Sequence, residues 1–149
     1  MLMQRILTIV VIGINLCSAL VSGAANTDVP DVVTAGIDAY TKSGSGAAVE
    51  AWIKGSAVES NRKLRDQIAN TLQQAEILYG KILGWELVRV VPITASCWRV
   101  YAALKYEKGP LWAAFDCYKS NAWILADVQF HTSAKEVLPA SILSGGTSQ

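Results

Sequence analysis

The spacing of hydrophobic residues changes once along the chain, close to Gly80. Before this glycine, apolar residues recur every three or four positions, which is the period of an amphipathic helix. The pattern predicts three helices: one that begins near Pro30, a short one that stops at Gly55, and a long one that starts at Ser56 or Ser60. The apolar stripe of the long helix consists of Leu64, Ile68, Leu72, Ala75 and Tyr79. Gly80 is expected to end this helix in a left-handed conformation.

After Gly80 the period becomes two, which predicts β-strands. Four runs rich in β-branched and aromatic residues follow, separated by short turns: 81–94, 97–107, 110–119 and 122–132. Helices followed by such a meander predict an α+β fold, with three N-terminal helices packed on a curved four-stranded antiparallel sheet. This single domain is expected over residues 26–139, and the small polar residues 140–149 predict a disordered tail.

The first 25 residues follow the order of a secretory signal peptide. Arg5 precedes an apolar run over residues 6–14, and small residues lead to Ala24 and Ala25. Cleavage after either alanine would export the domain to the periplasm or the medium, without a stable membrane anchor. The alternative is that the leader is kept as an anchor, although an anchor needs about 20 predominantly apolar residues. Here the run is shorter, and Asn15 interrupts it.

Charge and composition exclude several classes of partner. The full chain has 13 basic and 12 acidic residues, and loss of Arg5 with the leader makes the two numbers equal. A nucleic-acid-binding domain normally shows a basic surplus, so no nucleic acid is expected. The one basic cluster, Asn61–Arg65, is interpreted as a solvated helix face. With one histidine, and no glycine-rich phosphate loop, the sequence predicts neither a metal site nor a cofactor.

Cys97 and Cys117 flank a Glu-Lys-Gly-Pro turn, and the residues leave their pairing open. Export would place them in an oxidising compartment, where a disulfide closing this loop would stabilise the fold by about 3 kcal/mol. A four-residue turn ending at Gly109, however, places Arg99 directly opposite Asp116 and separates an apolar face from a polar one. The two cysteines then lie on different faces, unless a bulge at Gly109 shifts the register.

Candidate ligand-binding residues come from the polar positions of the predicted strands. Arg99 and Asp116 are expected to form a cross-strand ion pair beside Tyr101, and Arg99 would hold an anionic ligand if this face lined a pocket. Asp127 and His131 are candidates for an acid/base pair at a pocket mouth. They lie about 13 Å apart along a strand, too far for direct contact. No catalytic set is identified.

Two faces are predicted for the last strand. One face carries Trp123, Leu125, Asp127, Gln129 and His131; the other, assigned to the core, carries Ile124, Ala126, Val128 and Phe130. On the neighbouring strands, Trp112 shares the polar face with Tyr101 and Tyr118. An exposed aromatic face of this kind is typical of a homodimer or partner surface, so Trp112 and Tyr118 are candidate partner contacts.

Two stretches carry a family resemblance. The first is ILYGKILGWELVRV, with a Tyr-Gly-Lys hinge, and the second is RVYAALKYEKGPLWAAFDCYKSNAWILADVQFHTSAKEVLP, with a Tyr-Glu-Lys-Gly-Pro turn and a Phe-x-x-Tyr strand end. Over residues 31–139 the chain resembles small secreted bacterial members of the nuclear transport factor 2-like superfamily, which have the cystatin-like fold. The resemblance implies a cone-shaped pocket between helices and sheet. That superfamily holds isomerases, dehydratases, secretion-system parts and binding modules, so the resemblance leaves the function open.

Three functions are weighed. The leading hypothesis is a small exported, non-catalytic module that binds a small ligand or a protein partner through the helix–sheet pocket or the aromatic face. The second is an isomerase or dehydratase, which requires Asp116, Asp127 or His131 to point into a cavity, with a raised carboxylate pKa. The third is a periplasmic subunit of an envelope assembly that keeps its leader as an anchor.

Overall fold

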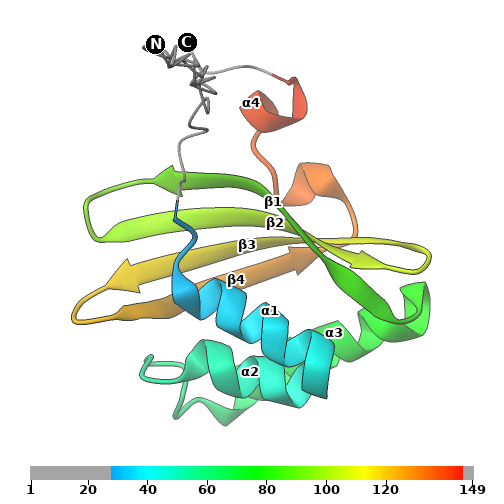
Figure 1. Ribbon diagram of the computed structural model, residues 1–149, viewed down its shortest axis with the longest axis horizontal. Coiled ribbons are helices and arrows are strands. Elements are labelled where there is room, and N and C mark those ends of the chain that lie inside the picture. The colour runs from blue at the N-terminus through cyan, green and yellow to red at the C-terminus, as the bar shows by residue number, and fades with distance from the viewer. Residues whose placement is uncertain (1–27, 146–149) are drawn as a thin grey trace, which may run out of the picture.

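The computed structural model describes residues 28–145, so the predicted signal peptide and residues 146–149 lie outside the described part. The elements are α1 (Asp31–Ser43), α2 (Ser45–Ile53), α3 (Arg62–Tyr79), β1 (Ile82–Pro92), β2 (Cys97–Tyr106), β3 (Gly109–Lys119), β4 (Trp123–His131), the 3-10 turn η1 (Ala134–Glu136) and α4 (Ala140–Leu143). The α+β prediction is confirmed: α1, α2 and α3 lie on one side of a four-stranded antiparallel sheet with the order β1-β2-β3-β4 (Figure 1). Within residues 28–145, no helix has the length and apolar character needed to cross a membrane.

Both ends of α3 have identifiable signals. The side chain of Asn61 accepts a hydrogen bond from the backbone N–H of Leu64 at 3.1 Å, which satisfies one of the free donors of the first turn. The predicted start at Ser56 or Ser60 is therefore wrong, because the capping residue is Asn61. Gly80 ends the helix as predicted, with φ 83° and its N–H bonded to the carbonyl of Glu76.

The β2–β3 hairpin has the register that residue alternation predicts. Arg99 lies directly opposite Asp116, without a bulge at Gly109. The apolar face of the hairpin is buried under the helices and consists of Val100, Ala102, Leu104, Leu111, Ala113, Phe115 and Cys117. Cys97 and Cys117 lie on opposite faces and are both free, so the disulfide alternative is not formed.

The last strand differs from its predicted pattern. Asp127 lies opposite Asp116, whereas Leu125 lies opposite Cys117, which leaves Ala126 as an extra residue in a β-bulge. The bulge reverses the alternation, so the predicted core assignment is correct for Val128 and Phe130 but wrong for residues 123–126. The core side of β4 consists of Trp123, Leu125, Val128 and Phe130.

Trp52 occupies the centre of the core between α1, α2 and the sheet. Its indole N–H donates a hydrogen bond to the carbonyl of Val33 at 3.3 Å, and its ring packs on Phe115 and Phe130 with centroids 5.3 and 5.9 Å away. Gly36 permits this approach, because a Cβ atom there would lie 1.9 Å from the indole nitrogen. The helix–sheet interior is thus filled by side chains at this point.

The C-terminal segment covers part of the opposite face of the sheet (Figure 1). Leu138 is buried against Tyr101 and Ala114, and Ile142 of α4 packs on the same cluster. The predicted disordered tail is therefore wrong for residues 140–143, which form α4. The physical reason is that Ile142 packs on an apolar cluster on the sheet. The local composition of residues 140–149 does not reveal that cluster.

Candidate functional site

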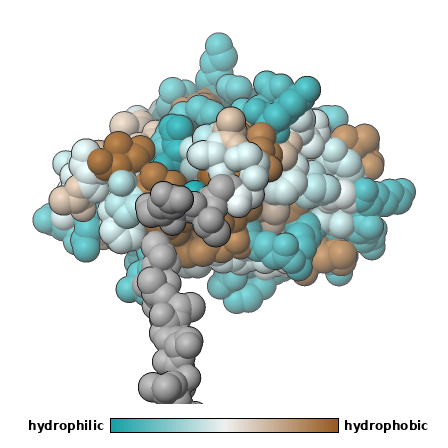
Figure 2. Space-filling view, turned by 90° about the horizontal axis from the view of Figure 1, so that it is seen from above, coloured by the Kyte–Doolittle hydropathy of each residue, from teal (hydrophilic) through white to brown (hydrophobic). Residues whose placement is uncertain are grey.

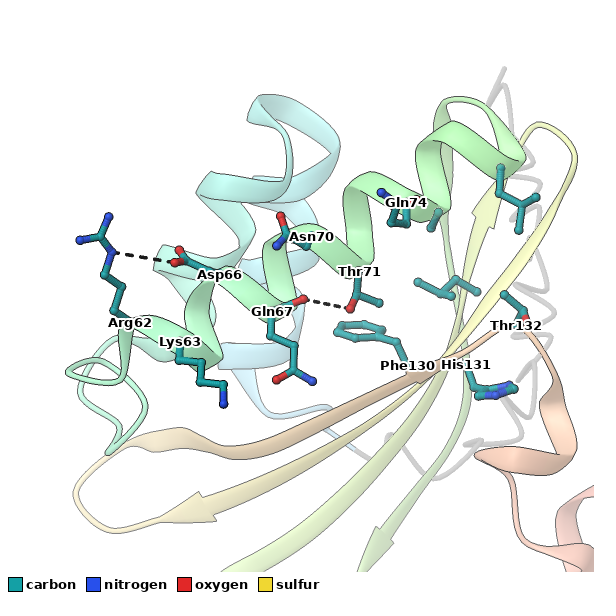
Figure 3. Close-up of a pocket in the computed structure, with 13 residues that line it drawn as sticks. Arg62, Lys63, Asp66, Gln67, Asn70, Thr71, Gln74, Phe130, His131 and Thr132 are labelled. Atoms are coloured by element: carbon teal, nitrogen blue, oxygen red, sulfur yellow. Dashed lines mark hydrogen bonds and ion pairs between the residues drawn. The ribbon is translucent and has the colours of Figure 1, made fainter.

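A groove of about 920 Å³ lies between α3 and the sheet, next to β4 (Figure 3). A smaller cavity of about 250 Å³ adjoins it between the same two elements and shares Gln67, Thr71 and Phe130 with it. Along α3, the lining runs from Arg62 to Leu78. The groove thus follows most of the length of the helix.

The floor of the groove is apolar. Phe130 points from β4 towards α3 (Figure 3), and Leu111 of β3 also lines the groove. The helix adds Ala75 and Leu78, and Leu78 is 58 % exposed. Phe130 reaches this position because the bulge in β4 keeps the last core-facing residues of the strand on the helix side.

Uncharged polar side chains form the wall opposite β4. Gln67, Asn70 and Gln74 follow one another at intervals of three and four residues, so they lie on one face of α3. Each carboxamide carries both donors and acceptors, and none bonds another side chain within residues 28–145. Thr71 lies among them and donates its hydroxyl to the carbonyl of Gln67 at 2.9 Å. The wall therefore offers free hydrogen-bonding groups of both kinds.

The N-terminal end of α3 gives the groove a basic end. Arg62 and Lys63 lie in the first turn, which contains no acidic residue. Asp66 approaches Arg62 at 3.8 Å and offsets one of the two positive charges, so Arg62, Lys63 and Asp66 together keep a net charge of +1. The positive end of the helix dipole adds to these charges. This end of the groove favours an anionic group.

Most of the predicted ligand-binding residues lie on the other face of the sheet. Arg99 donates two hydrogen bonds to Asp116, at 2.5 and 2.6 Å, and these raise the pKa of Arg99 above its usual value. Tyr101 is buried against Leu138, and Asp127 is exposed opposite Asp116. The structure brings Arg99 and Asp116 together as predicted, but none of these four candidates lines the groove.

His131 is the only predicted candidate that lines the groove. Its ring points away from α3 (Figure 3), and its Nδ1 atom accepts a hydrogen bond from the N–H of Ser133 at 3.0 Å. Asp66 is the one carboxylate among the described lining residues, and it faces Arg62. The groove therefore contains His131 but neither Asp116 nor Asp127, the two carboxylates that the enzyme hypothesis places in a cavity. No group of three potential metal ligands occurs within residues 28–145.

Three buried groups are unsuited to chemistry. Burial raises the pKa of the Cys117 thiol to about 12, and the thiolate is the reactive form of cysteine. Tyr40 and Tyr106 share a hydrogen bond of 3.0 Å between their hydroxyls, and burial raises the pKa of Tyr106 to about 12. None of the three lines the groove. They are parts of the core.

The predicted aromatic partner face is partly covered by the chain itself. Trp112 is half-buried beside the cluster of Tyr101, Ala114 and Leu138, whereas Tyr118 is exposed. From the side of β1 and α4, hydrophobic residues occur as separate patches divided by hydrophilic ones (Figure 2). Among residues 28–145, the exposed large hydrophobic residues are Ile77, Leu78, Leu83, Leu87, Ile93, Tyr118 and Leu143.

Comparison with known proteins gives no match to a family model, to a curated protein or to a solved structure. The class defined by the fold and the site is an α+β domain with an open groove between a helix and an edge strand. Of the residues that line the groove, sequence reasoning had selected only His131 as a candidate. The one available signal was the spacing of Gln67, Asn70 and Gln74 on a single face of the long helix.

Proposed function

We propose that this chain is a small exported, non-catalytic binding module and that the groove between α3 and β4 is its ligand site. The observation that carries the proposal is the combination of an apolar floor, a carboxamide wall and a basic end in one groove. Ligand sites are typically mostly apolar, with a few polar groups that fix orientation. The signal-like leader supports export, and the resemblance to the nuclear transport factor 2-like superfamily supports a ligand site between helices and sheet.

The groove is best suited to an elongated amphipathic ligand with an anionic end. Its apolar part would lie on Phe130, Leu111 and Leu78, and its anionic end beside Arg62 and Lys63. Among the described lining residues the one carboxylate, Asp66, faces Arg62, and this favours binding over catalysis.

The probe 1-anilinonaphthalene-8-sulfonate tests the site, because it is apolar, anionic and fluorescent when bound to an apolar surface. Two neighbouring aliphatic residues provide a matched pair. Leu78 lines the groove, whereas Ile77 is 77 % exposed and does not. We expect Leu78→Glu to weaken probe binding about tenfold, equivalent to about 1.4 kcal/mol. We expect Ile77→Glu to bind as the unchanged protein does.

Both variants change exposed residues, so their thermal melting curves should match that of the unchanged protein and confirm that each is folded. The proposal would be refuted if the unchanged protein failed to increase the probe's fluorescence. Equal losses in the two variants would also refute it, since the binding would then not depend on the groove.

A further inference from the structure

We infer that the natural occupant of this groove is an extended peptide segment, bound by strand addition to β4, with an acidic residue beside the start of α3. This inference rests on the groove being the ligand site. It adds the class of ligand and the way in which the ligand's main chain is held.

The first feature that supports strand addition is the edge of the sheet at β4. β4 is the last strand of the order β1-β2-β3-β4, and no other described strand pairs with its second edge. Such an edge presents unpaired backbone N–H and C=O groups. The part of the chain from Val128 to Thr132 lines the groove or the adjoining cavity. A ligand in the groove therefore lies beside an edge that can accept a strand.

The second feature is the carboxamide wall on α3, opposite β4. A strand paired with β4 has its own second edge, which would face α3 and carry unpaired N–H and C=O groups. Gln67, Asn70 and Gln74 supply both donors and acceptors there. Gln67 and Gln74 are seven residues apart on a helix, about 10 Å at 1.5 Å per residue, which is the length of about three extended residues. The carboxamide wall can thus satisfy the outer edge of a short strand.

The third feature is the apolar lining of the groove together with its basic end. In an added strand every second side chain would lie on the helix side of the sheet, the side on which Phe130 of the neighbouring β4 lines the groove. Apolar residues at alternate positions of the peptide suit this apolar lining. Arg62 and Lys63 make the N-terminal end of α3 positive, with no acidic residue in the first turn. An acidic side chain on the peptide complements this charge.

The experiment begins with a display library of random short linear peptides, selected on the unchanged protein. We expect enriched peptides to carry apolar residues at every second position and an acidic residue towards one end. A synthetic copy of an enriched peptide should bind Lys63→Glu about tenfold more weakly, equivalent to about 1.4 kcal/mol. Lys42→Glu, an exposed site in α1 that does not line the groove, is the matched control and should bind normally.

Amide hydrogen exchange tests strand addition directly. Saturation with the peptide should slow exchange at alternate backbone amides between Val128 and Thr132, because only alternate groups of an edge strand point outward. N-methylation of the peptide nitrogens that face β4 should abolish binding. N-methylation of the alternate nitrogens, which face the carboxamide wall, should weaken binding less, because the main-chain pairing with β4 is kept. Unchanged exchange in this segment, or tolerance of N-methylation at both sets of nitrogens, would overturn strand addition.

The outcomes separate this inference from the proposed function. If no peptide is enriched while Leu78→Glu still removes binding of the fluorescent probe, the peptide inference is wrong and the groove remains a small-ligand site. If neither the probe nor any peptide binds, both proposals are wrong. Both proposals are supported if Lys63→Glu, but not Lys42→Glu, weakens peptide binding and the bound peptide protects alternate amides of β4.

Discussion

At the scale of single residues, two aspartates that face each other across β3 and β4 have opposite energetic roles. Asp116 accepts two hydrogen bonds from Arg99, and the side chains of that ion pair are only 35 % and 28 % exposed. Asp127 lies directly opposite Asp116 and carries the same charge. Like charges in this position are destabilising, whereas a partly buried bidentate ion pair is stabilising.

We therefore expect Asp116→Asn and Asp127→Asn to change the free energy of unfolding in opposite directions. Asp116→Asn should lower the free energy of unfolding by about 1 kcal/mol, at the upper end of the range for exposed pairs. Asp127→Asn should raise it by a few tenths of a kcal/mol, about the value of one cross-strand pair. Urea unfolding at neutral pH measures both. Equal losses in the two variants would show that Asp127 takes part in the ion pair and does not oppose it.

The buried tyrosine pair predicts how stability depends on pH. Burial raises the pKa of Tyr106 to about 12, and burial also raises the pKa of Tyr40. An unfolded tyrosine ionises near pH 10, so at higher pH the unfolded state binds fewer protons than the folded state. The folded state is then disfavoured as pH rises. We expect the urea midpoint to fall as pH rises from about 10 towards 12.

Tyr106→Phe should make this fall shallower, because one group that must stay protonated in the core is removed. Tyr118→Phe is the matched control, since Tyr118 is exposed, and it should leave the slope unchanged. A midpoint that falls equally steeply in Tyr106→Phe would contradict the assignment of the effect to the buried pair.

At the scale of elements, the packing of α1 on α2 depends on one glycine. A Cβ atom at Gly36 would lie 1.9 Å from the indole nitrogen of Trp52, so Gly36→Ala must displace a fully buried side chain. We expect a loss of about 1–3 kcal/mol, as for an overpacked core. Gly46 of α2 has nothing within 4 Å of its Cβ position, so Gly46→Ala should stabilise by about 0.5–1 kcal/mol.

Chemical unfolding of the two glycine variants measures this difference, with each variant compared with the unchanged protein. Both substitutions replace a helical glycine with alanine, but Gly36 lies in the interior of α1 and Gly46 in the first turn of α2, so the helix-propensity gain is smaller at Gly46. A stable Gly36→Ala variant would mean that Trp52 moves without loss, and that the contact of α1 with α2 is looser than its geometry indicates.

The sequence predicted those elements whose pattern is local. The β2–β3 hairpin was placed correctly because only one register separates the apolar face from Arg99 and Asp116. The strand β4 was also placed correctly, but the faces of its first half were not, because Ala126 forms a bulge that reverses the alternation and nothing in the neighbouring residues marks it. The start of α3 was displaced because the serines before it compete with Asn61 as caps.

The candidate site was less predictable than the fold. Sequence reasoning chose charged and aromatic residues on strands, such as Arg99 and Asp127, and the structure places these away from the groove. The groove depends on where α3 lies relative to β4, which is a tertiary distance. The polar row Gln67, Asn70 and Gln74 would look the same in the sequence on any solvated helix face. Only the distance between α3 and β4 identifies it as the wall of a groove.

At the scale of the whole molecule, the sheet has a different cover on each face. The helices α1, α2 and α3 lie on one face, and the C-terminal segment from η1 to α4 packs on the other (Figure 1). Leu138 is the most buried residue of that segment, beside Tyr101 and Ala114. The groove and the C-terminal cover are thus separated by the sheet, and changes to one should leave the other intact.

Two leucines of the C-terminal segment test this independence. Leu138 is 6 % exposed and Leu143 is 47 % exposed. We expect Leu138→Ala to cost about 2 kcal/mol, the lower end of the range for buried leucines, because the thin cover can collapse onto the sheet. Leu143→Ala should change stability by less than about 0.5 kcal/mol.

Binding of the fluorescent probe should be unchanged in both variants, because neither leucine lines the groove. Loss of probe binding in a folded Leu138→Ala variant would show that the two faces are coupled through the sheet, and that the C-terminal cover holds β4 in its groove-forming position.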